Sequence, residues 1–168
     1  RSRRIADPVN ITDWFPTVCD YMNVPIPEGL DGQNLRSLIE TGTAGEHRDF
    51  AFSEYNCHGM PYGMFMIRWK QYKYIYYCYD KPQLFDLSTD PAEDHSLLDV
   101  PVPAPESMIA AEECHKRLLS ICNPYEVDLR ARTFQKKSKE ALGIQTYDTD
   151  RAVVQYRIQK QFSKSLLK

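Results

Sequence analysis

Residues 64–79 read MFMIRWKQYKYIYYCY, and this stretch decides the fold. Met64–Trp69 and Tyr72–Tyr79 are rich in aromatic and branched residues, and Lys70-Gln71 separates them, which predicts two strands joined by a tight hairpin turn. Successive residues of a strand point to opposite sides, so the second strand presents one lysine–isoleucine–tyrosine face and one mainly tyrosine face. Two further segments predict strands: Phe50–Tyr55 and Gln83–Leu87. The four strands together predict a small antiparallel sheet.

Helical patterns lie on both sides of the predicted strands. Val9–Ile11 predicts a short strand, and a helix over Asp13–Met22 is expected to follow it, with Thr12 as its cap. Leu35–Ile39 predicts a second, short helix that ends in the glycine-containing segment 41–45. Strands framed by helices in this order predict an α+β fold.

Three helical segments are predicted after Pro105. In the first, an apolar stripe at spacings of three and four consists of Met108, Ala111, His115, Leu118, Leu119 and Cys122. The second begins with Asn123 as cap, Pro124 at the first helical position and Glu126 three residues after the cap, and Gly143 ends it. Its stripe consists of Val127, Ala131, Phe134, Ala141 and Leu142. The third begins at Thr149 and is interpreted as an apolar stripe with a solvated basic surface.

The composition excludes several classes of partner. Of the 168 residues, 21 are Lys or Arg and 23 are Asp or Glu, which gives a net charge of −2. This balance does not favour a nucleic-acid partner. No apolar run approaches the roughly 20 residues of a membrane helix, so no membrane span is expected.

The sequence holds no local motif for hydrolysis. It lacks a nucleophile elbow, a phosphate-binding loop and a zinc-protease motif, and its five cysteines form no C-x-x-C pair. Cys57-His58 and Cys114-His115 place a thiol beside an imidazole, but adjacent residues on a helix or strand point in different directions. Asp94-His95 follows Asp90-Pro91 and is interpreted as part of a turn rather than as a metal site. We therefore expect no catalytic residue and no metal ligand in this chain.

Tyrosines crowd one predicted strand, with Tyr72, Tyr74, Tyr76, Tyr77 and Tyr79. A tyrosine offers a flat apolar face and a hydroxyl group, so this strand has two interpretations. It either packs the sheet with its hydroxyl groups exposed, which is the more frequent role, or stacks on a sugar ring.

The order of several short motifs resembles the C-terminal portion of type I sulfatases, a family of the alkaline phosphatase superfamily. The motifs are Val9–Asp20, Val24–Leu35, Ser53–Tyr55, Met66–Arg68, Tyr72–Ile75, Leu84–Leu87 and Asp90–Glu93. Beyond residue 100, Ser120–Asp128 resembles the tail of arylsulfatase K-like and alkylsulfatase relatives.

This resemblance implies an α+β C-terminal subdomain of an α/β sulfatase fold, with a four-stranded antiparallel sheet, packed helices and a helical tail. Residues 1–22 would be the last strand and helix of a truncated catalytic domain, residues 23–100 the sheet subdomain and residues 101–168 the tail. The N-terminal catalytic domain would be missing from this sequence. We expect Trp14, Phe15 and Val18 to form an exposed apolar face, because that helix would pack on the missing domain.

The resemblance also implies a division of chemistry. Family members use a formylglycine nucleophile, made from the first residue of C/S-x-P/A-x-R, and a calcium ion, and both are expected upstream of this chain. Cys122 alone approximates the motif, but Glu126 stands where arginine is required. The full-length protein is thus expected to be a sulfuric ester hydrolase, and this chain alone to be inactive.

What this chain is expected to supply is one wall of the substrate pocket. In relatives, the loop after the Ser-Glu-Tyr strand approaches the part of the substrate that carries no sulfate, so Tyr55, Asn56 and His58 are candidate substrate-binding residues for a sulfated small molecule or glycan. Two alternatives stay open: a phosphonate or phosphate ester hydrolase of the same superfamily, and a non-catalytic module that binds a glycan or a protein. The compartment is also open, since family members are lysosomal, secreted or periplasmic and bacterial relatives can be cytoplasmic.

Overall fold

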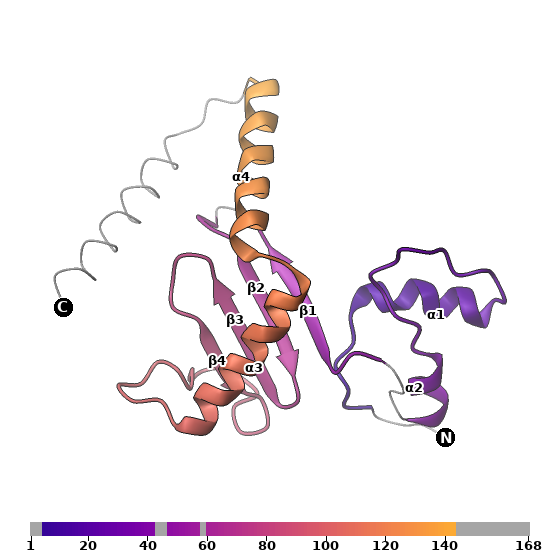
Figure 1. Ribbon diagram of the computed structural model, residues 1–168, viewed down its shortest axis with the longest axis horizontal. Helices are drawn as coiled ribbons and strands as arrows, with labels where there is room; N and C mark the ends of the chain where they lie inside the picture. The colour runs from indigo at the N-terminus through magenta and orange to yellow at the C-terminus, as the bar shows by residue number, and fades with distance from the viewer. Residues whose placement is uncertain (1–4, 43–46, 58–59, 144–168) are drawn as a thin grey trace.

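The computed structural model describes residues 5–42, 47–57 and 60–143 and contains one four-stranded sheet. Its strands are β1 (Phe50–Tyr55), β2 (Met64–Trp69), β3 (Tyr72–Tyr77) and β4 (Gln83–Asp86). Every neighbouring pair is antiparallel and the spatial order follows the chain (Figure 1). The predicted sheet is therefore confirmed, with β1 and β2 at the predicted bounds.

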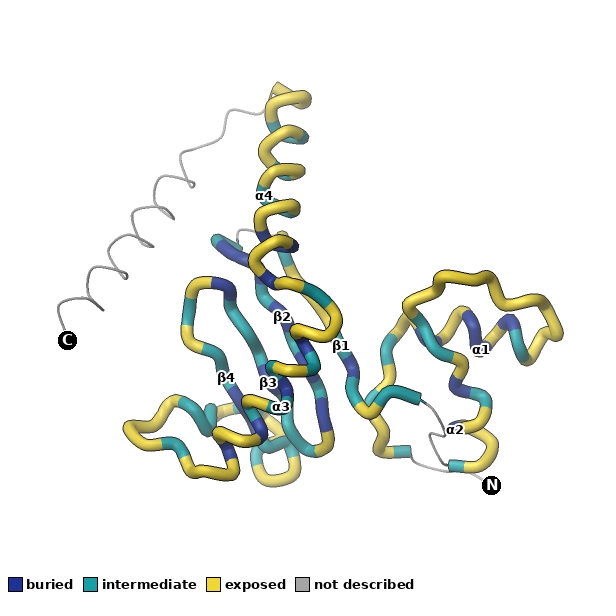
Figure 2. The backbone as a smooth tube through the Cα atoms, in the orientation of Figure 1, coloured by how far each residue is buried: buried dark blue, intermediate teal, exposed yellow. Residues whose placement is uncertain are grey.

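One face of the sheet packs against α3 (Pro105–Ile121). The register aligns Phe52, Ile67, Tyr74 and Leu84 in one row across the four strands. Ile67 and Leu84 are fully buried, and they share a core with Cys114 and Leu118 of α3 (the buried positions along the strands are dark blue in Figure 2). The alternation of strand residues thus places one apolar face under α3.

Two shorter helices stand beside the β1 edge of the sheet (Figure 1). The 3-10 turn η1 (Ile11–Asp13) leads directly into α1 (Trp14–Tyr21), and α2 is Arg36–Thr41. The Thr17 hydroxyl accepts a hydrogen bond from the Leu35 N–H at 2.8 Å, which ties α1 to the start of α2. Gly42 ends α2 in the left-handed conformation, as its C-terminal position predicts.

The helix α4 (Pro124–Ala141) follows α3 after only two residues and extends past the end of the sheet (Figure 1). The Asn123 side chain caps it by accepting from the Tyr125 N–H at 3.1 Å, and Gly143 follows its end with a φ of 64°. The predicted start and end of this helix are confirmed. The helix predicted from Thr149, and with it the end of the predicted tail, lies outside the described residues. None of the helices in the described ranges is long and apolar enough to cross a membrane.

Three local predictions are wrong. Val9–Ile11 is not a strand, because the backbone N–H of Asn10 donates to the Asp13 carboxylate and the chain turns. Thr12 does not cap α1, because it lies inside η1, and Asp13 precedes the helix instead. The predicted strand Tyr72–Tyr79 ends at Tyr77, although the Cys78 N–H still donates to the Gly63 carbonyl at 3.1 Å.

The predicted stripes of α3 and α4 are also partly wrong. The buried face of α3 is Ser107, Ala110, Cys114 and Leu118, whereas Met108 and Leu119 are more than half exposed. In α4, Val127 is buried but Phe134 and Leu142 are exposed. In both helices, fewer apolar residues are buried than the sequence pattern predicts.

Candidate functional site

The β1–β2 connection and the β3–β4 turn meet at one end of the sheet. The register pairs Tyr55 with Met64, and Met64 with Tyr77, so the last residue of β1 and the last residue of β3 lie at the same end. The Tyr62 hydroxyl donates to the Asp80 carboxylate at 3.1 Å and joins the two connections. This end of the sheet carries Tyr55 and Asn56, two of the substrate-binding residues predicted from the sequence.

Tyr55 and Asn56 lie where β1 leaves the sheet. The Tyr55 side chain points to the face opposite α3 and is 37% exposed, and a hydrogen bond with the Cys57 thiol raises the pKa of its hydroxyl. Asn56 is partly buried, and its Oδ1 has no hydrogen-bond partner within the described part of the chain. His58, the third predicted residue, lies outside the described residues.

Three side chains of α4 contact the backbone of the β1–β2 connection. Asp128 accepts from the Gly63 N–H at 2.6 Å, and Arg132 donates to the Met60 carbonyl at 2.8 Å. Gln135 donates to the Asn56 carbonyl. These three residues were not predicted from the sequence. The sequence does contain an indication of them, because polar residues spaced by four and three lie on one side of a predicted helix and can contact a neighbouring segment together.

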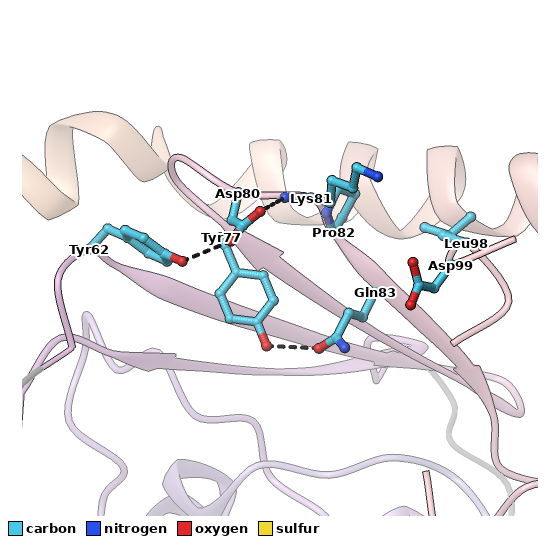
Figure 3. Close-up of a pocket in the computed structure, with 8 residues that line it drawn as sticks. All are labelled: Tyr62, Tyr77, Asp80, Lys81, Pro82, Gln83, Leu98 and Asp99. Carbon is cyan, nitrogen blue, oxygen red and sulfur yellow. Dashed lines mark hydrogen bonds between the residues drawn. The ribbon is translucent and has the colours of Figure 1, made fainter. Parts of the chain in front are cut away.

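A cavity of about 390 Å³ opens beside this connection, lined in part by Tyr62, Tyr77, Asp80, Lys81, Gln83 and Asp99. Figure 3 shows the Tyr62 hydroxyl directed at Asp80 and the Tyr77 hydroxyl directed at Gln83, to which it donates at 2.8 Å. The lining offers two tyrosine rings and groups of both charges. Such a surface is suited to a polar ligand rather than to an apolar one.

A second polar cluster surrounds Asp13, which is fully buried. Burial raises the pKa of this carboxyl, but hydrogen bonds from the N–H groups of Gln33 and Asn10, together with Arg48 at 2.5 Å, lower it below its ordinary value overall. His47 also contacts it at 3.5 Å. The groups that contact this carboxylate all belong to the chain itself. The cluster therefore joins the start of α1 to the segment before β1, and its role is structural.

The tyrosines of β3 mostly pack the sheet. Tyr74 is 3% exposed, and its ring packs edge to face on His115 of α3 at 6.2 Å. Tyr76 donates to the Tyr125 hydroxyl at 3.1 Å. Burial raises the pKa of the Cys114 thiol to about 12 and lowers the pKa of His115, so the adjacent pair does not form a thiolate–imidazolium couple.

Two other sequence candidates have structural roles. The Asp90 carboxylate accepts from the N–H groups of Asp94 and His95, which confirms the turn. Glu126, which stands in place of the motif arginine, accepts from the Asn123 amide at 3.0 Å and belongs to the helix start. Within residues 5–42, 47–57 and 60–143 there is no group of three or more His, Cys, Asp or Glu side chains that could hold a metal ion.

The antiparallel sheet, covered on one face by α3 and followed by α4, is an α+β arrangement. Comparison with protein families assigns this arrangement. The model of the family described as "N-sulphoglucosamine sulphohydrolase, C-terminal" matches residues 1–121, and the chain belongs to this family.

The relatives of the chain are sulfatases and related hydrolases. It is 30% identical over 156 residues to arylsulfatase K of Gallus gallus, covering 85% of this chain and 28% of that protein. The phosphonate monoester hydrolase of Agrobacterium radiobacter is 25% identical with a TM-score of 0.52, over 64% of this chain and 23% of that chain. A putative sulfatase from Bacteroides thetaiotaomicron is 24% identical with a TM-score of 0.53, over 74% and 25% respectively, and shows the same fold. The chain thus spans about a quarter of the length of these proteins.

Proposed function

We propose that this chain is the C-terminal portion of a sulfatase that hydrolyses sulfate esters, and that it contributes one wall of the substrate pocket and structural support. The observation that carries this proposal is the match of residues 1–121 to a sulphohydrolase C-terminal family. The likeness to arylsulfatase K over most of the chain supports the same assignment.

The apolar surface of α1 supports the division into two parts. Trp14 is 64% exposed, Phe15 53%, Val18 37% and Met22 68%. A contiguous exposed apolar surface of this kind marks an interaction site. We assign it to the N-terminal catalytic domain, with residues 1–22 as the last part of that domain, residues 23–100 as the sheet subdomain and the remainder as the tail.

The pocket wall is assigned to Tyr55 and Asn56, with His58 as a third predicted member. Tyr55 offers an aromatic face and a hydroxyl at a partly exposed position, and an asparagine amide both donates and accepts hydrogen bonds. These groups suit the hydroxyl-rich, non-sulfate part of a sulfated glycan or small molecule. Tyr55 and Asn56 are assigned to substrate binding rather than to catalysis, because no group of metal-ligating side chains lies among the described residues to activate them.

The formylglycine and the calcium ion expected of the family do not fit the residues that the structure describes. Cys122 belongs to a helix start, while Cys19, Cys78 and Cys114 are buried thiols in packed regions. The carboxylates of Asp13 and Asp128 are occupied by internal donors. We assign both groups to the catalytic domain and derive no reaction step from them here.

The proposal is tested by assaying the full-length protein against a matched pair of probes, an aryl sulfate and an aryl phosphonate monoester. We expect kcat/KM to favour the sulfate. The variants Tyr55→Phe, Asn56→Ala and His58→Ala are expected to raise KM for a sulfated disaccharide and to leave kcat nearly unchanged, because uniform binding is lost. Hydrolysis of neither probe would contradict the proposal and favour a non-catalytic binding module.

A phosphonate or phosphate ester hydrolase is the second candidate. It is favoured by the likeness to the Agrobacterium phosphonate monoester hydrolase, a same-superfamily relative. A kcat/KM that favours the phosphonate probe would select it.

A further inference from the structure

We propose that α4 is a positioning element of the pocket wall, and that Asp128, Arg132 and Gln135 hold the β1–β2 connection in the conformation that receives substrate. This inference rests on the proposed function, because the connection is the part of the chain assigned to the substrate. The three residues are positioning residues and not catalytic ones, since their contacts are to the protein backbone.

The geometry is that of a three-point attachment. Residues 128, 132 and 135 are spaced by four and three, so they lie on one side of α4. Each contacts a different backbone group of the connection: the Gly63 N–H, the Met60 carbonyl and the Asn56 carbonyl. The three contacts therefore reach described residues at both ends of the connection, Asn56 at one end and Met60 and Gly63 at the other.

The three side chains also contact one another. Arg132 donates from Nε to Asp128 at 3.1 Å and from Nη1 to Gln135 at 3.1 Å. Asp128 is 2% exposed, so its charge is stabilised by the arginine and by the Gly63 N–H rather than by water. Networks in which each member orients the next are more rigid than isolated hydrogen bonds.

The connection is shaped to accept this attachment. A Cβ at position 63 would lie 2.8 Å from Asn56 Oδ1, 3.1 Å from the Phe65 ring and 3.3 Å from the Asp128 Cβ, so a larger residue would displace the Asn56 side chain and crowd α4. At the other end of the helix, Pro124 is buried and its carbonyl accepts from the Cys78 thiol at 3.4 Å. Thus α4 is anchored to the sheet and holds the connection against it.

The family model ends at residue 121, before α4, whereas the likeness to arylsulfatase K covers 85% of this chain and therefore includes this helix. Asn56 contacts α4 directly through Gln135. We infer that α4 sets substrate preference: it fixes the wall that contacts the non-sulfate part of the substrate and leaves the sulfate-cleaving groups unaffected.

The test compares Arg132→Met and Gln135→Ala with the wild type in the full-length protein. Arg130→Met is the matched control, because Arg130 is an exposed arginine on the same helix. Hydrogen exchange at the Gly63 amide should quicken about tenfold in both test variants. With a sulfated disaccharide, KM should rise about fivefold while kcat stays within about twofold. A small aryl sulfate lacks the sugar that would contact Tyr55 and Asn56, so with this substrate both KM and kcat should stay within about twofold of the wild-type values.

Arg132→Lys is the conservative variant, because lysine keeps a positive charge and can donate to the Met60 carbonyl. Its KM for the disaccharide should lie between those of the wild type and Arg132→Met. Gln135→Ala guards against a folding artefact: its thermal unfolding midpoint should match that of Arg130→Met.

The proposal is overturned if exchange at Gly63 is the same in Arg132→Met as in Arg130→Met. It is also overturned if exchange quickens but KM for the disaccharide does not change. If the wild-type protein hydrolyses neither probe, the proposed function fails, whereas the exchange measurement still decides whether α4 holds the connection.

Discussion

Truncation of Leu118 tests how α3 packs on the sheet. Leu118 is fully buried and shares the core with Phe65, Ile67 and Cys114. Leu→Ala at a buried site costs about 2–5 kcal/mol, from lost transfer free energy and from the cavity left behind. We expect Leu118→Ala to lower the free energy of unfolding by about 3 kcal/mol, since the side chain is central and its neighbours are held by the sheet.

The neighbouring residue is the matched control. Leu119 is 55% exposed, so Leu119→Ala should change the free energy of unfolding by only about 0.5 kcal/mol. The assay is urea unfolding of the 168-residue chain followed by circular dichroism. With a slope of about 2 kcal/mol per molar, Leu118→Ala should lower the midpoint by about 1.5 M. Equal losses for the two variants would refute the packing of α3 described above.

Three further predictions concern other parts of the chain. Gly32→Ala should destabilise the chain by more than about 2 kcal/mol in the same urea assay, because a Cβ there would lie 2.1 Å from the Thr12 carbonyl oxygen, which cannot move aside; wild-type stability would contradict this. The pKa of Asp13 is lowered in the folded state, so its stabilisation is present above about pH 4 and is lost as the pH falls through the lowered value. Asp13→Asn should reduce that acid dependence, as measured by unfolding between about pH 5 and 2, and an unchanged slope would argue against it. Cys57 is exposed whereas burial raises the pKa of Cys114 to about 12, so iodoacetamide at pH 8 should label Cys57 first and Cys114 only after unfolding, as peptide mass spectrometry would show; equal labelling would contradict this.

The sheet was predictable because its signals are local. Met64–Trp69 is rich in aromatic and branched residues and forms β2 at the predicted bounds, and the turn at Lys70-Gln71 fixes the register of β2 and β3. The start of α4 was predictable for the same reason, since Asn123 and Pro124 act within one helical turn.

The packing of α3 was not predictable from periodicity alone. Met108 and Leu119 are apolar and lie at helical spacing, yet the sheet contacts only the strip through Cys114 and Leu118. Which apolar residues face the core depends on where the helix crosses the sheet, and this is a tertiary property.

The attachment by α4 depends on residues far apart in the sequence. Asp128 and Gly63 are 65 residues apart, and Gln135 and Asn56 are 79 residues apart. The sequence directed attention to Tyr55 and Asn56 through a family resemblance, but nothing near them indicates what holds them. The only indication in the sequence was the polar face of α4, and its role can be recognised only when the β1–β2 connection that it contacts is known.

We propose that this chain supplies a pocket wall and support to a sulfatase whose reactive groups lie in another domain. The most direct measurement is sulfate release from an aryl sulfate by the full-length protein and, at equal concentration, by the 168-residue chain alone. We expect turnover by the full-length protein and none by the chain. Sulfate release by the chain alone, or none by the full-length protein, would contradict the claim.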